Sequence, residues 1–85
     1  MYKITIKKTA AKELSTLPKK VIVTVTQAIL GLATTPRPAG CKKLKGSINA
    51  LWRIRIGDYR VIYIINDEIK IIDVQKVGHR RDIYE

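Results

Sequence analysis

This 85-residue chain has one cysteine, one histidine and no phenylalanine. One cysteine excludes an intramolecular disulfide and offers no metal-ligand spacing, so we predict neither a metal site nor a cofactor. No apolar run approaches the ~20 residues that a membrane-spanning helix needs. The N-terminus alternates in polarity and lacks the apolar block of a signal peptide. We therefore expect a single domain over residues 1–85, located in the cytoplasm and not bound to a membrane.

Acidic residues are scarce, and one long segment has none. Lys and Arg number 17 against 7 Asp and Glu, a formal charge of +10, and no acidic residue occurs between Leu14 and Gly57. A field of this sign attracts nucleic acid or an acidic protein. The chain is also 46% apolar, which is enough for a core and excludes a disordered tail.

The first part of the sequence predicts a strand and two helices. Residues 2–7 alternate in polarity, as a half-buried strand does. Thr9 is positioned to cap a short helix over residues 10–14, and Pro18 suits the first position of a second helix. Residues 21–33 are β-branched at first, which favours a strand. Their apolar positions nevertheless cluster within about 120° of a helical wheel, so we interpret the segment as a helix. Two positions fall on the opposite side of that wheel: Val23 and Leu30.

The remaining sequence predicts a loop and an antiparallel sheet. Residues 34–47 hold two prolines, two glycines and several basic side chains, a composition typical of a loop. Residues 51–56, 59–65 and 69–77 alternate in polarity and follow one another so closely that they must be antiparallel neighbours. The predicted fold class is α+β: a two-helix hairpin packs on one face of a small antiparallel sheet, in the order β-α-α-β-β-β.

Gly57-Asp58 is predicted to be the two-residue turn of a hairpin, since glycine favours its first central position. This turn sets Arg55 opposite Arg60, about 5 Å apart at Cβ, and brings Arg53 to the same face. The apolar positions share the other face, which the helices should cover: Trp52, Ile54, Ile56, Tyr59, Val61, Tyr63 and Ile65. Asp73 is expected to relieve part of the charge repulsion, and a bound phosphate would relieve more. We therefore predict an anion-binding face.

A second basic cluster, Gly78-His79-Arg80-Arg81, follows the last predicted strand. Histidine is the side chain that ordinarily titrates near neutral pH, so His79 is a candidate proton-transfer group. Arg80 and Arg81 extend the cationic surface, and Tyr84 is a candidate for stacking on a base or donating a proton. Two lysines of the basic loop are further candidates for phosphate binding: Lys43 and Lys45.

Two runs of this sequence resemble the RelE/ParE superfamily of bacterial toxins, above all its RelE-like members: RIRIGDYRVIYII and VGHRRDIY. The predicted N-terminal strand, the helix hairpin, the proline-containing loop and Leu44-Lys45-Gly46 follow in the same order, so the resemblance covers nearly the whole chain. It implies an antiparallel sheet carrying two N-terminal helices. It also implies a toxin that cuts messenger RNA in the ribosomal A site and is neutralised by an antitoxin that wraps its basic surface.

The resemblance assigns roles to individual residues. The family's functional positions correspond to Arg53 and Arg55 before the turn, Arg60 after it, Arg80 in the GHR element, and Tyr84 near the C-terminus. The pair before the turn is Arg-Ile-Arg where Lys-Ile-Lys is the familiar pattern. An arginine effectively cannot lose its proton, so Arg55 is a poor general base.

Together these features predict a ribosome-dependent endoribonuclease, in which the ribose 2′-hydroxyl attacks the adjacent phosphate. Arg60 and Arg80 would stabilise the phosphorane, while Arg53 and Arg55 would position the scissile phosphate. The expected partners are an acidic antitoxin, the ribosome and messenger RNA. Two alternatives stay open: a ParE-like toxin that poisons DNA gyrase without cutting RNA, and a non-catalytic basic module that binds RNA or an acidic protein.

Overall fold

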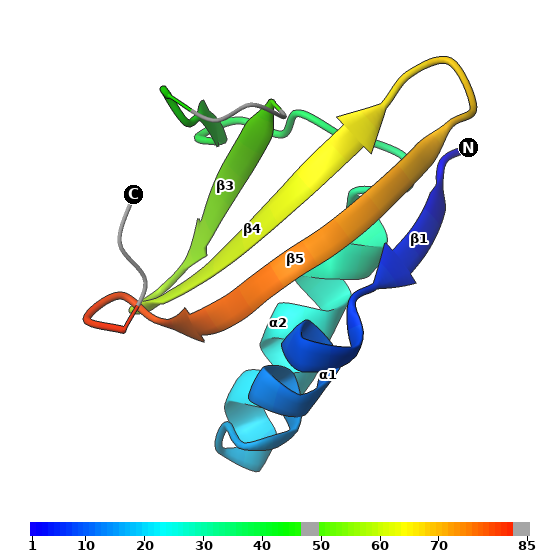
Figure 1. Cartoon of the computed structure of the whole chain (residues 1–85). Helices are drawn as coiled ribbons and strands as arrows, with labels where there is room; N and C mark the ends of the chain where they lie inside the picture. The colour runs from blue at the N-terminus through cyan, green and yellow to red at the C-terminus, as the bar shows by residue number, and fades with distance from the viewer. Residues whose placement is uncertain (47–49, 83–85) are drawn as a thin grey trace.

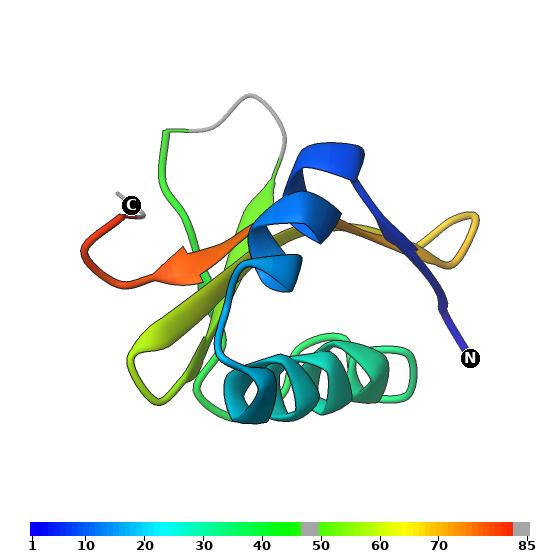
Figure 2. The same ribbon diagram turned by 90° about the horizontal axis from the view of Figure 1, so that it is seen from below.

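The computed structural model describes residues 1–46 and 50–82, which form two helices and one five-stranded sheet (Figure 1). The elements are β1 (Lys3–Ile6), α1 (Lys8–Ser15), α2 (Lys19–Gly31), β2 (Lys42–Lys43), β3 (Leu51–Ile56), β4 (Tyr59–Asn66) and β5 (Ile71–His79). The strands lie in the order β1-β5-β4-β3-β2, and both helices lie on one side of the sheet (Figures 1 and 2). The predicted α+β class and helix hairpin are confirmed.

The pairing of the strands is mixed. β3, β4 and β5 pair antiparallel, as predicted. The prediction of an entirely antiparallel sheet is wrong at one edge, where β1 pairs parallel with β5 and Lys3 lies opposite Ile71. A parallel pair needs a long connection, and here both helices and three strands separate the two partners in sequence. No tight turn therefore imposes an antiparallel arrangement on β1.

The segment predicted as a loop contains the short strand β2. Lys42 pairs with Arg53 and Lys43 with Trp52, at the outer edge of β3. This pairing satisfies backbone groups that an open sheet edge would leave to solvent. The flanking prolines and glycines are typical of a loop, and a strand of two residues is too short to show an alternating pattern. The strand was therefore not predicted from the sequence.

The helices begin at positions that differ slightly from those predicted. Lys7 is extended and its N–H donates to Val74 O at 2.9 Å, so α1 starts directly after this contact with β5. Thr9 lies inside the first turn and does not cap the helix. Pro18 precedes α2 at its N-cap instead of occupying its first position. The helical interpretation of residues 21–33 is confirmed up to Gly31, because tertiary burial decides it against β propensity, and the last two residues lie in the turn that follows.

Apolar side chains between the sheet and the helices form the core. Its buried members are Ala10, Val25, Ile29, Leu32, Ile54, Val61, Tyr63, Ile72, Val74 and Val77. The predicted apolar face of β3 and β4 is confirmed, since its other members pack against this cluster.

Tyr63 is fully buried and its hydroxyl donates to Pro36 O at 2.8 Å. Burial raises the pKa of Tyr63. Val23 and Leu30 stay 57% and 60% exposed on the outer side of α2, as the helical wheel predicts.

The turn between β4 and β5 is longer than its three predicted residues. Asn66 Oδ1 accepts the N–H groups of Glu68 and Ile69, both at 3.1 Å. Lys70 follows with a φ of +56°, so β5 starts two residues later than predicted, at Ile71.

Within the described residues, neither helix is both long and apolar enough to cross a membrane.

A polar cluster fastens the loop after α2 to this turn. Arg37 Nη2 lies 2.9 Å from Asp67 Oδ2, and the Tyr2 hydroxyl donates to Asp67 Oδ1 at 2.6 Å. The Arg37 guanidinium also lies 4.9 Å from the ring centroid of Trp52. The hydrogen bonds from Arg37 and Tyr2 lower the pKa of Asp67 to about 2. These contacts hold together segments that are far apart in sequence.

Candidate anion-binding site

The β3–β4 hairpin sets three arginines on one face of the sheet, opposite the apolar face that packs against the helices. Gly57 has a φ of +60°, which glycine adopts without the penalty that a Cβ brings, and the turn closes in two residues. Arg55 lies directly opposite Arg60, as predicted. Arg55 is exposed and Arg60 half-buried, whereas Arg53 is only 5% exposed. The three side chains therefore share a face but differ in their access to a ligand.

A hollow of about 610 Å³ opens where this face meets the end of β5. The described residues that line it are all basic: Arg60, His79, Arg80 and Arg81. Arg60 lies opposite Gly78 in the β4–β5 pairing. Glycine has no side chain, so β5 presents none on this face directly opposite Arg60. Guanidinium groups around such a hollow suit an anion with several oxygens.

Backbone N–H groups hold the turn that carries the second basic cluster. The N–H of Arg80 donates to Asp58 O at 2.7 Å, and that of Asp82 to His79 O at 2.9 Å. The first bond ties this turn to the β3–β4 turn, so the two basic clusters predicted from the sequence lie next to one another. Asp58 Oδ1 also lies 3.8 Å from Arg80 Nε, but the side chains are 64% and 65% exposed. Such an ion pair contributes little to stability.

His79 lies on the other face of the sheet from Arg55 and Arg60. It pairs with Tyr59 across the strands, and the ring centroids are 5.4 Å apart at an interplanar angle of 78°. Cross-strand partners share a face, and Tyr59 packs against the core on the helix side. At the end of β5, the N–H of Arg81 donates to His79 Nδ1 at 3.2 Å. The imidazole therefore borders the basic hollow without facing the paired arginines.

The remaining predicted site residues are more scattered. Lys43 pairs with Trp52 and so shares the helix-side face, and Lys45 is exposed in the following turn. Lys42, which was not predicted as a site residue, pairs with Arg53 and shares the arginine face. It is one residue from Lys43, so the two lie on opposite faces of the strand, but no sequence pattern marks a strand at these residues. The predicted residue Tyr84 lies outside the described residues.

Asp73 is not placed to relieve the repulsion between the paired arginines. It lies opposite Ile64 on β4, four residues from Arg60 and thus about 13 Å along the strand. Its carboxylate accepts hydrogen bonds from Thr5 Oγ1 at 2.9 Å and from Gln75 Nε2 at 2.7 Å. The carboxylate next to the basic hollow is instead that of Asp58, in the hairpin turn.

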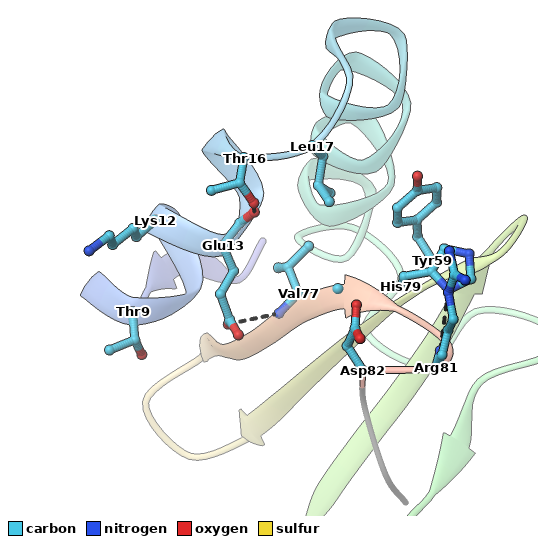
Figure 3. Close-up of a pocket in the computed structure, with 11 residues that line it drawn as sticks. Thr9, Lys12, Glu13, Thr16, Leu17, Tyr59, Val77, His79, Arg81 and Asp82 are labelled. Atoms are coloured by element: carbon cyan, nitrogen blue, oxygen red, sulfur yellow. Dashed lines mark hydrogen bonds between the residues drawn. The ribbon is translucent and has the colours of Figure 1, made fainter.

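A second cleft of about 610 Å³ lies between α1 and the end of β5 (Figure 3). Its polar lining includes Lys12 and Glu13 of α1 and Thr16 just after that helix, with His79 and Arg81 at the other side. Glu13 Oε1 accepts the N–H of Val77 at 3.3 Å and so satisfies a backbone group of β5 beyond the end of β1 (Figure 3). Sequence reasoning missed this contact. Across residues 1–46 and 50–82, no three His, Cys, Asp or Glu side chains gather to hold a metal ion.

Comparison with known proteins defines the class. The family model of the "ParE toxin of type II toxin-antitoxin system, parDE" matches residues 4–84. Toxin RelE of Mycobacterium tuberculosis is 32% identical over 84 residues, which cover 98% of this chain and 86% of that protein. Toxin RelG of the same organism is also 32% identical, and the match covers 98% and 95% of the two chains.

A solved structure gives the same result for the fold. The archaeal RelE–RelB complex from Pyrococcus horikoshii contains a chain that matches with a TM-score of 0.81 and 35% identity, over 93% of this chain and 94% of that chain. This protein belongs to the RelE/ParE superfamily of toxins of type II toxin–antitoxin systems. The resemblance seen in the two sequence runs is therefore confirmed, and so is the RelE-like fold.

Proposed function

We propose that this toxin cuts messenger RNA on the translating ribosome, in the cytoplasm. The observation that carries the proposal is the hollow lined by Arg60, Arg80 and Arg81, with exposed Arg55 beside Arg60. Guanidinium groups bind phosphate oxygens through paired N–H donors and keep their charge at any physiological pH. Such a surface is suited to a phosphodiester, and the charge of +10 favours a long polyanion over a single phosphate.

In the proposed reaction, the ribose 2′-hydroxyl of one nucleotide attacks its own 3′-phosphate. The new O–P bond forms as the hydroxyl loses its proton, and the bond from phosphorus to the 5′-oxygen of the next nucleotide breaks. That oxygen takes up a proton, so the products are a 2′,3′-cyclic phosphate and a 5′-hydroxyl. Because the reaction needs the 2′-hydroxyl, DNA is not a substrate.

Arg60 and Arg80 are the proposed stabilisers of the dianionic phosphorane, an electrostatic role that often dominates such catalysis. Arg55 is exposed, and its proposed role is to hold the substrate phosphate. Arg53 is 5% exposed, so its proposed contribution is its charge beneath the surface and not direct contact. None of these arginines can act as a general base near neutral pH. The proposed catalysis is therefore mainly orientation and charge stabilisation, and the ribosome helps to orient the message.

Primer extension on a message translated in vitro tests this function. We expect discrete cuts that require the ribosome, and a loss of roughly two orders of magnitude for Arg60→Ala. Lys8→Ala is the matched control, since it removes one positive charge from the exposed start of α1, away from the hollow. A message left intact by the wild-type protein would contradict the nuclease function. Wild-type cleavage by folded Arg60→Ala would remove Arg60 from the site.

A second candidate function is the poisoning of DNA gyrase. Two observations favour it: the matching family model is that of ParE toxins, and arginines replace the familiar lysines at Arg53 and Arg55. Supercoiling of relaxed plasmid by purified gyrase separates the two functions, because a gyrase poison inhibits it while an RNA nuclease leaves it unchanged. The third possibility, a non-catalytic basic binding module, predicts no growth arrest when the protein is expressed.

We also propose that an acidic antitoxin binds this chain. The relative from Pyrococcus horikoshii is solved as a RelE–RelB complex. In this chain, Val23 and Leu30 expose more than half of their surface along α2, and a groove of about 460 Å³ lies between the C-terminal half of α2 and β3. Apolar side chains on a strongly basic surface suit a partner segment that is acidic and amphipathic.

A further inference from the structure

His79 combines two contacts that together restrict its chemistry. Its Nδ1 accepts the N–H of Arg81 at 3.2 Å, and its ring meets Tyr59 edge to face at 5.4 Å. We propose that His79 is a positioning residue: it holds the turn that carries Arg80 and Arg81 and does not transfer the proton in catalysis. The effect on cleavage rests on the proposed nuclease function, whereas the contact itself does not.

The hydrogen bond determines which ring nitrogen carries the proton. A neutral imidazole has one N–H and one acceptor nitrogen. Since Nδ1 accepts from Arg81, the proton resides on Nε2. The ring then has no free lone pair with which to act as a base. To act as an acid from the imidazolium form, it must carry a proton on Nδ1, which removes the acceptor from the Arg81 amide. Either role in proton transfer therefore disturbs the turn.

Within the described part of the chain, the amide of Arg81 differs from its two neighbours in its acceptor. The amides on either side of it are bonded to backbone oxygens, Arg80 N–H to Asp58 O and Asp82 N–H to His79 O, while the Arg81 amide uses the imidazole. The imidazole therefore completes a set of three consecutive amide contacts. Without it, we expect Arg80 and Arg81 to sample more orientations at the mouth of the basic hollow, which weakens their joint contact with a phosphate.

Protonation of the imidazole would also loosen the turn that carries Arg80 and Arg81. The charged side chains that line the two cavities bordering His79 are Lys12, Glu13, Arg60, Arg80, Arg81 and Asp82. Most of them are cations, so an imidazolium adds repulsion at the same time as it loses the acceptor for Arg81. We therefore expect cleavage to fall when acid protonates the ring, and this fall should depend on His79.

Asparagine at position 79 can keep the hydrogen bond from the Arg81 amide while removing the ionisable imidazole. An asparagine side chain readily accepts the N–H two residues further on, as Asn66 does here for Glu68 at 3.1 Å. In the translated-message assay, we expect His79→Asn to retain cleavage within about threefold of wild type and to lose the acidic decline. His79→Ala should cut roughly tenfold more slowly, the usual effect of losing one hydrogen bond. Equal losses in the two variants, or no loss in His79→Ala, would overturn the proposal.

Nuclear magnetic resonance of ¹⁵N-labelled protein tests the contact without any substrate. We expect the neutral ring to be the Nε2–H tautomer, and the Arg81 amide resonance of the wild type to move when acid protonates His79. In His79→Asn the amide should stay shielded from solvent exchange and no longer respond in this pH range. The opposite tautomer, with the proton on Nδ1, would overturn the proposal. If the wild-type protein cuts no message, this experiment still decides the positioning role while the nuclease function fails.

Discussion

At the scale of single residues, arginines that occupy equivalent positions in the sequence pattern differ in their exposure to solvent. Arg53, Arg55 and Arg60 share one face, yet Arg53 is 5% exposed and Arg55 is open to solvent. The shared face follows from the two-residue turn and the strand period, both of which are local. Arg53 pairs with Lys42 of β2, a strand that precedes β3 by several residues, so no pattern within residues 51–60 predicts its burial.

Asp67 illustrates a residue whose chemistry is also set by distant partners. Hydrogen bonds from Arg37 and Tyr2 lower its pKa to about 2 from the ordinary 3.8. A depressed pKa in the folded state stabilises the fold above the ordinary value, and this stabilisation is lost as pH falls through the folded value. We expect the urea midpoint of the wild type to fall between about pH 4 and pH 2 more steeply than that of Asp67→Asn. Glu68→Gln, which changes an exposed carboxylate in the same turn, is the control. Parallel curves for wild type and Asp67→Asn would contradict this role.

At the scale of elements, the clearest predictions came from segments with a strong local rule. The Gly57-Asp58 turn fixed the register of β3 and β4 correctly, because its length leaves one pairing that keeps the apolar face together. The secondary structure of α2 was harder to predict, because its β-branched start favours a strand while its apolar period favours a helix. Burial of Val25 and Ile29 in the core explains why the helix forms. β2 was missed because a two-residue strand has no period to detect.

The effect of a glycine-to-alanine substitution on stability can be compared at two positions, Gly57 in the β3–β4 turn and Gly31 at the end of α2. A Cβ at either position meets no atom within 4 Å, so only the backbone conformation matters. Gly57 has a φ of +60°, and Gly57→Ala should destabilise the fold by about 1–2 kcal/mol. Gly31 ends α2 without a positive φ, and Gly31→Ala should stabilise it by up to about 1 kcal/mol. Chemical denaturation measures both, and changes of the same sign would refute the argument.

At the scale of the whole molecule, the excess positive charge is the dominant property. The charge of +10 destabilises the compact state through repulsion and speeds association with anionic partners. The fold gathers part of it at one end of the sheet, where the turn after β5 meets the β3–β4 turn. This concentration is what connects the composition of the chain with the proposed phosphodiester site.

The same charge predicts how binding of an acidic antitoxin responds to salt. We expect nanomolar or tighter affinity that weakens progressively between about 50 and 500 mM salt, as charges are screened. Titration calorimetry or surface plasmon resonance measures it. A variant with Lys42, Lys43 and Lys45 all changed to glutamine should bind more weakly at low salt and approach the wild type at high salt. Affinity unaffected by salt would show that apolar contacts alone hold the complex.

The amino-acid sequence was sufficient to predict the α+β class, the helix hairpin, the arginine pair across the β3–β4 turn, the apolar face and the family. These depend on periodicity, turn chemistry and motifs, which are properties of neighbouring residues. Other features emerged from the folded structure: the parallel pairing of β1 with β5, the burial of Arg53, the contact of Glu13 with Val77, and the side of the sheet on which His79 lies. Each of these depends on segments that meet only after the chain has folded, and long-range contacts leave no periodic trace in a single sequence.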